Sequence, residues 1–123
     1  MTSPAVKDDE LAGFEKLCSL DDVWEGEMEA FDTATGEEVL ILCLPGGEIK
    51  AFQGMCPHQE ISLVEGTFQN GVLTCRAHLW QFDCHTGAGI NPSDCRIAEY
   101  PIRIEDDDIY VKVEGVVACK SHT

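Results

Sequence analysis

The sequence lacks any long apolar segment and is poor in positive charge. Its 123 residues include 8 Lys and Arg against 23 Asp and Glu, so the formal net charge is −15. No apolar run approaches the roughly 20 residues of a membrane helix. The polar start, residues 1–11, does not predict a signal peptide. The charge argues against nucleic acid and anionic membranes as partners and favours a partner with a basic face. We therefore expect a cytoplasmic protein.

The sequence also lacks internal repeats, low-complexity linkers and any convincing long amphipathic helix. Short apolar stretches separated by turn residues predict strands instead. We expect a helical turn over 21–24 capped by Asp21, a loop over 86–93 and a solvated acidic turn over 106–108. The turn dipeptide Asn70-Gly71 leads into one of the strands. The expected strands are residues 14–18, 27–31, 39–44, 49–52, 72–74, about 80–82, 100–104 and 109–113.

This length and strand spacing predict one small all-β domain, a sandwich or barrel. Residues 1–12 carry no strand signal and are expected to form a flexible N-terminal extension. The domain proper then covers residues 13–123.

Seven cysteines are present, which is an odd number for a framework of disulfides. Without a signal peptide, reduced thiols or metal ligands are the better interpretation. Cysteine and histidine occur together in two short segments, Cys56-Pro57-His58 and Cys75-Arg76-Ala77-His78, with 16 residues between them. Each segment follows an expected strand, so a β scaffold can present both as neighbouring loops. Cys56, His58, Cys75 and His78 are therefore the candidate metal ligands.

Two metal centres fit two thiolates and two imidazoles. A structural zinc site is one, but its usual arrangement pairs Cys with Cys and His with His. Here each segment holds one of each. That mixture suits a Rieske [2Fe–2S] cluster, in which two cysteines ligate one iron and two histidines the other. Cys56 and Cys75 would then hold the first iron, and His58 and His78 the second.

The sequence resembles the Rieske ferredoxins, and among them the ferredoxin component of bacterial toluene (aromatic) monooxygenases. The resemblance implies a Rieske fold: antiparallel β-sheets form a base, and two ligand loops form a cluster-binding part at about residues 54–95. It also implies one [2Fe–2S] cluster per chain. The resemblance runs from about residue 14 to the C-terminus and is carried by residues 56–60, 75–80, 89–92, 98–101 and 107–111.

The implied function is electron transfer without substrate chemistry. The resemblance implies an NADH-dependent flavin reductase as electron donor, a di-iron hydroxylase as acceptor and a monomeric carrier. The alternatives are a Rieske subunit of another oxygenase or of a nitrite reductase system, and a zinc-binding structural module. The chain is too short to add the mononuclear iron domain of a complete Rieske oxygenase.

Two departures from high-potential Rieske proteins bear on the reduction potential. The ligand loops lack the additional cysteines that form a disulfide in respiratory Rieske proteins. Residues 79–82 lack the hydroxyl groups that donate to the cluster in high-potential members. Because fewer donors stabilise the reduced form less, we expect a potential at the low end of the Rieske range, about −150 mV.

The remaining thiols and histidines do not fit the ligand pattern. Trp80 follows His78 by two residues and is expected to shield the cluster, to contribute to the partner surface or to pack in the core. His85 and His122 are not expected to be ligands. Structural or incidental thiols are expected at Cys18, Cys43, Cys84, Cys95 and Cys119.

Overall fold

The computed structural model describes residues 13–57, 61–76, 79–91 and 95–118. Two short 3-10 turns, η1 (Leu20–Asp22) and η2 (Leu63–Glu65), accompany the strands in these residues. The strands are β1 (Glu15–Ser19), β2 (Met28–Asp32), β3 (Glu38–Cys43), β4 (Ile49–Gln53), β5 (Thr67–Gln69), β6 (Val72–Thr74), β7 (Gln81–Asp83), β8 (Gly89–Asn91), β9 (Ile102–Glu105) and β10 (Asp108–Val111).

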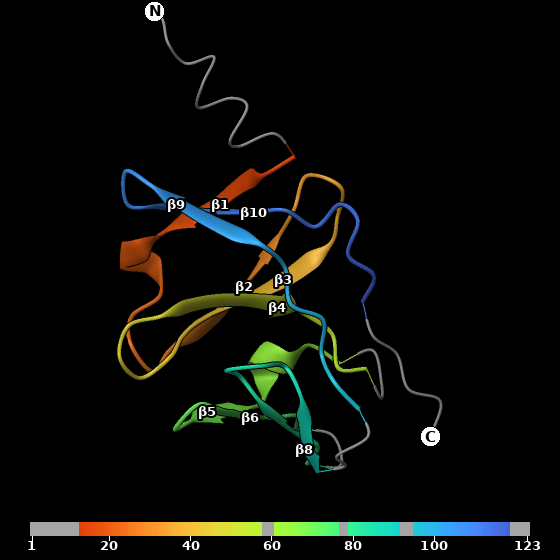
Figure 1. Cartoon of the computed structure of the whole chain (residues 1–123). Coiled ribbons are helices and arrows are strands. Elements are labelled where there is room, and N and C mark those ends of the chain that lie inside the picture. Colours follow the sequence, from red (N-terminus) through yellow and green to blue (C-terminus); the bar gives the residue numbers. More distant parts are fainter. Residues whose placement is uncertain (1–12, 58–60, 77–78, 92–94, 119–123) are drawn as a thin grey trace, which may run out of the picture.

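The strands form three antiparallel sheets stacked one above another (Figure 1). One sheet has the order β1-β10-β9, the middle one β2-β3-β4, and the third β5-β6-β7-β8. The first sheet therefore joins the two ends of the described chain. The expectation of an all-β fold is confirmed.

The middle sheet is buried on both faces, which explains the apolar sequence of β3. Side chains alternate along a strand, so Val39 and Ile41 face one side while Leu40 and Leu42 face the other. The first pair belongs to a core shared with the β1-β10-β9 sheet, called here the base core. The second pair belongs to a core shared with the β5–β8 sheet, called the cluster core. One strand thereby organises both halves of the molecule.

Turn chemistry sets most of the connections. At the expected turn between β5 and β6, Asn70 and Gly71 both have positive φ, 53° and 78°. This is the backbone that a two-residue hairpin requires and that these residue types adopt most readily. The expected acidic turn is also confirmed: Asp106 and Asp107, with φ of 52° and 68°, join β9 to β10.

The expected strands are confirmed to within about two residues at each end, with two corrections elsewhere. The 3-10 turn is capped by Ser19 rather than Asp21, because the Ser19 hydroxyl accepts from the Asp21 amide while Asp22 accepts from the Ser19 amide. The segment expected to be a loop over 86–93 contains β8, which pairs with β7.

None of the described residues forms a helix with the length and apolar character needed to cross a membrane. The proposed N-terminal extension, residues 1–12, lies outside the described residues, so the domain boundary stays a prediction.

Candidate metal centre

The first candidate loop begins where β4 ends. The Leu63 amide donates to the Gly54 carbonyl at 2.8 Å, and the Cys56 amide donates to the Ile61 carbonyl at 2.9 Å. Met55 and Ser62 form an isolated antiparallel bridge between these two bonds. These hydrogen bonds join the chain on the two sides of positions 57–60, which are called here the first loop. His58 belongs to that loop and lies outside the described residues.

The second candidate loop repeats this closure between β6 and β7. The Cys75 amide donates to the Trp80 carbonyl at 2.7 Å, again a bond from a cysteine to the residue five positions later. Positions 76–79, called here the second loop, lie between these two residues, and His78 among them lies outside the described residues. Both cysteines thus make the same hydrogen bond to the residue five positions later. The histidine is the second residue after the cysteine in one segment and the third in the other.

Both candidate cysteines are buried in one place. Cys56 is 4% exposed and Cys75 is fully buried, and both belong to the cluster core. Trp80 is partly buried against the same core, which agrees with its expected packing in the core. Both thiols are free of disulfides. Two of the four candidate ligands are thereby brought together, while the two histidines fall outside the described residues.

A buried glutamine anchors the first loop. Gln53 is 2% exposed, and its side-chain amide donates to the Met55 carbonyl at 2.8 Å. Its side-chain oxygen accepts from the Ala98 amide at 2.7 Å. A polar side chain with both ends bonded can be buried at little net cost. Gln53 therefore ties the residue before Cys56 to the segment that leads into β9.

Glu38, the first residue of β3, holds the same loop from its other side. Its carboxylate accepts from the Ser62 hydroxyl, and its carbonyl accepts from the Gly54 amide at 3.0 Å. Gly54 permits this approach, because a Cβ there would lie 2.4 Å from Glu38 Cγ. The loop is thus bonded to the middle sheet rather than free at its base.

Gly66 has the same function for the second loop. A Cβ at Gly66 would lie 1.9 Å from the Thr74 carbonyl oxygen, immediately before Cys75. Only glycine allows the chain after η2 to lie this close to β6. Nearby, Arg76 Nε donates to Glu65 Oε1 at 2.8 Å, an ion pair that links η2 to the second loop at the surface.

Three of the other described cysteines are buried thiols with raised pKa values. Burial raises the pKa of Cys84 to about 12 and that of Cys18 to about 11, and it also raises the pKa of Cys43. These thiols stay protonated near neutral pH, whereas a metal ligand must be a thiolate. Their predicted role as structural thiols agrees with these surroundings.

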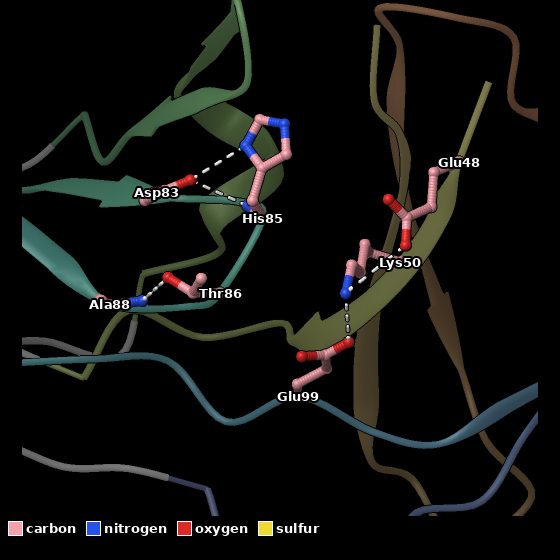
Figure 2. Close-up of polar contacts among 7 residues, drawn as sticks. All are labelled: Glu48, Lys50, Asp83, His85, Thr86, Ala88 and Glu99. Atoms are coloured by element: carbon pink, nitrogen blue, oxygen red, sulfur yellow. Dashed lines mark hydrogen bonds and ion pairs between the residues drawn. The ribbon is translucent and has the colours of Figure 1, made fainter. Parts of the chain in front are cut away.

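His85 lies at the end of the β6–β7 hairpin opposite to Cys75, because Val72 pairs with Asp83. Its Nδ1 is 3.0 Å from Asp83 Oδ1, and its amide donates to the same oxygen (Figure 2). The hydrogen bond from the His85 backbone amide is the main reason that the pKa of Asp83 is lowered. On the other side of Figure 2, Lys50 pairs with Glu99 at 3.0 Å and Glu48 at 3.7 Å, which raises its pKa chiefly through the bond to Glu99. His85 is therefore engaged in a surface pair away from the candidate ligands.

The donor set fits a Rieske [2Fe–2S] cluster. Two buried cysteines that form no disulfide each bond to the residue five positions later, and a histidine follows each within three residues. Among the described residues no three Cys, His, Asp or Glu side chains gather around one point, which a site built entirely from those residues would require.

A comparison with known families decides the matter: the model of the Rieske [2Fe–2S] domain matches residues 13–101, which include both loops. This chain is a Rieske protein. It carries the Rieske cluster and transfers electrons without catalysing a reaction itself, as ferredoxins do.

Its relatives are ferredoxins of bacterial oxygenase systems. The ferredoxin component of the alkene monooxygenase system of Xanthobacter autotrophicus strain Py2 is 41% identical over 80% of both chains. The ferredoxin component of biphenyl 2,3-dioxygenase of Rhodococcus jostii RHA1 is 35% identical over 83% of this chain and 94% of the relative. The ferredoxin of carbazole 1,9a-dioxygenase from Nocardioides aromaticivorans IC177 has a similar structure, with a TM-score of 0.73 and 27% identity over 82% of this chain and 98% of that one.

The sequence motifs did not reveal Gln53 or Glu38. Neither residue type is a metal ligand in this pattern, and the partners Ala98 and Ser62 lie 45 and 24 positions away. Only the proximity of Gln53 to Cys56 in the sequence could have drawn attention to it.

Proposed function

We propose that this Rieske protein carries single electrons from an NADH-dependent flavin reductase to the di-iron hydroxylase of a hydrocarbon monooxygenase. The proposal includes Cys56, His58, Cys75 and His78 as the cluster ligands. It also includes a monomeric carrier in the cytoplasm.

The matched closure of the two loops is the observation that best supports the ligand assignment. Each amide bond positions a cysteine at the root of a four-residue loop, with its sulfur toward the cluster core. The histidines would stand farther out on the loops. Cysteine sulfurs would thus be shielded from water, and imidazoles would form the side that faces a partner.

When bound, the cluster supplies one-electron redox chemistry at a potential set by its ligands and their hydrogen bonds. The protein contributes a fixed geometry. Gln53 and Glu38 bond the residues on the two sides of the first loop, and Gly66 lets the chain pack closely against the residue before Cys75.

Two lines of support differ on the substrate class. The ligand-loop segments resemble those of aromatic monooxygenase ferredoxins, whereas the Xanthobacter relative is named for alkene oxidation. Both belong to monooxygenase systems acting on hydrocarbons. The substrate pocket is in another chain, and we propose the hydrocarbon class alone.

The first test is spectroscopic. We expect about two irons and two sulfides per chain and, after reduction, the low average g value of a histidine-ligated cluster. The reduced protein should then transfer its electron to the hydroxylase of its own host and support product formation. One zinc per chain, or oxidation only by a sirohaem nitrite reductase, would contradict the proposal.

A further inference from the structure

Leu79 combines two unfavourable features for which the described structure offers no compensation. It has a φ of 57°, in the left-handed region, and its side chain is 67% exposed. A leucine in this conformation costs about 1–2 kcal/mol relative to the right-handed region, whereas glycine or asparagine adopts it readily. The backbone of the second loop requires the conformation, but the folded chain gains little from a leucine side chain directed into water.

The position of Leu79 points to a partner. It lies directly after His78 and directly before Trp80, whose carbonyl closes the loop on Cys75. Met55, directly before Cys56, is another exposed apolar side chain next to a candidate ligand and is 40% exposed. The second loop and the residue before the first loop thus each present an apolar side chain to solvent, in a chain whose net charge is −15.

Charge and apolar contact have different roles in a transient complex. The acidic surface can steer a basic partner from a distance, but this attraction is screened by salt. A single exposed leucine exerts no attraction at a distance. Its contribution comes only when a partner covers it and water leaves the contact.

We propose that Leu79 is a contact residue for the oxygenase component, retained despite its strained backbone because its side chain is buried in the electron-transfer complex. This inference rests on the proposed function. The oxygenase is chosen as the partner because the relatives are named as components of oxygenase systems. Backbone strain at an exposed position beside a functional loop is consistent with a role of this kind.

The test uses the cluster-loaded protein and the hydroxylase from the same host. Leu79→Gly removes the side chain and relieves the strain, so unfolding stability should be equal or higher. The reduction potential and EPR spectrum should not change. The second-order rate of electron transfer to the hydroxylase should fall about tenfold, and the ratio to wild type should persist at high salt.

Three further variants separate the alternatives. Leu79→Asn tolerates the backbone conformation but is polar, and it should be slow like Leu79→Gly. Leu79→Met keeps an apolar side chain and should stay within about twofold of wild type. Ile104→Thr removes an exposed apolar side chain on β9, in the sheet farthest from the β5–β8 sheet (Figure 1), and should leave the rate unchanged.

Rates within twofold of wild type for both Leu79→Gly and Leu79→Asn would overturn the contact. An equal loss in Ile104→Thr would do the same, and so would a loss confined to the reaction with the reductase. If the wild-type protein fails to reduce the hydroxylase, the proposed function fails first and this inference falls with it.

Discussion

The two cores on either side of the middle sheet both contain cysteines, yet only one is proposed to hold a metal. Cys18 and Cys43 of the base core lie within β1 and β3. Cys56 and Cys75 of the cluster core lie just beyond the ends of β4 and β6. A cysteine within a sheet has its amide and its neighbours committed to strand pairing. A cysteine beyond a strand can begin a loop that brings a second ligand beside it.

Cys84 shares the burial and the position after a strand of Cys56 and Cys75, yet it is not a candidate ligand. It is fully buried in the cluster core and follows a strand, β7. Its amide, however, donates to the Gly71 carbonyl, at the end of the hairpin opposite to Cys75. Burial and a strand end are therefore insufficient, and the correct end of the sheet decides which thiol can be a ligand.

The largest expected effect follows from exchanging these cysteines for alanine. Cys75→Ala should abolish cluster binding, because one iron loses a thiolate. Cys84→Ala should retain about two irons per chain and an unchanged EPR spectrum. Iron and sulfide analysis of both variants measures the difference. A folded Cys84→Ala protein without iron would show that Cys84 is itself needed to bind the cluster.

Gly66→Ala should be nearly as severe. Its Cβ would meet a backbone carbonyl oxygen, which cannot move aside as a flexible side chain would. We expect a loss of about 3 kcal/mol or more in unfolding free energy, together with partial loss of iron, because the clash falls beside Cys75.

Gly36→Ala is the matched control for that variant. Gly36 has a φ of 89° but nothing within 4 Å of its Cβ position. Only the backbone strain remains, about 1 kcal/mol, and cluster content should be normal. Equal losses in the two variants would mean that close approach at Gly66 is unimportant. Denaturant titration and iron analysis decide between these results.

Gln53→Leu tests whether the buried amide holds the first loop. The substitution leaves the buried Ala98 amide without this partner, at a cost of about 1–3 kcal/mol, and it removes the part-buried bond to the Met55 carbonyl as well. The cluster should be lost faster on dilution into chelator. Gln69→Leu, at an exposed position on β5, should show neither change. A Gln53→Leu protein with wild-type stability would show that the Gln53 side chain does not hold the first loop.

The sequence was informative where local chemistry decides the structure. The turn at Asn70-Gly71, the acidic turn before β10 and the apolar run of β3 each follow from residue types within a few positions. The positions of Cys56 and Cys75 beyond strand ends were predictable for the same reason. The two histidine ligands remain a prediction, since they lie outside the described residues.

The structure was needed where a residue's role depends on partners far away in the sequence. β8 has the composition of a turn, with Gly89 and Asn91, and becomes a strand because β7 supplies its hydrogen-bond partners. The sequence predicts Asp21 as the cap of η1, whereas the structure has Ser19 in that position. Both residue types can cap a helical turn, and only the backbone geometry distinguishes them. Gln53 and Glu38 depend on partners from other parts of the chain, which no local pattern encodes.

The base core predicts a dependence of stability on alkaline pH. The pKa of Cys18 is raised from 9.0 to about 11, mainly by burial, with contributions from Asp22 and Asp108. Between these values the unfolded chain loses a proton that the folded chain keeps, so stability falls as the pH rises from about 9 to about 11. The slope from this one thiol approaches about 1.4 kcal/mol per pH unit.

Cys18→Ala removes this contribution while leaving the cluster core untouched. The variant should be less stable than wild type at pH 8, because a buried sulfur is lost, and the difference should narrow as the pH rises toward 11. Denaturant unfolding at several pH values measures it. A difference that stays constant would show that Cys18 ionises equally in the folded and unfolded chain.

The smallest expected effect concerns the turn between β9 and β10, on the side of the base core. Asp106 and Asp107 both have positive φ, and their like charges lie next to each other. Asn-Gly is the preferred pair for this backbone, so Asp106→Asn combined with Asp107→Gly should stabilise the protein by about 1 kcal/mol. The bond from the Leu20 amide to the residue 107 carbonyl involves backbone only and should survive. The melting temperature should rise by a few degrees, with potential and EPR spectrum unchanged, because the substitution lies outside the cluster core. A lower melting temperature would mean that the aspartate side chains stabilise the turn more than their backbone strain and mutual repulsion cost.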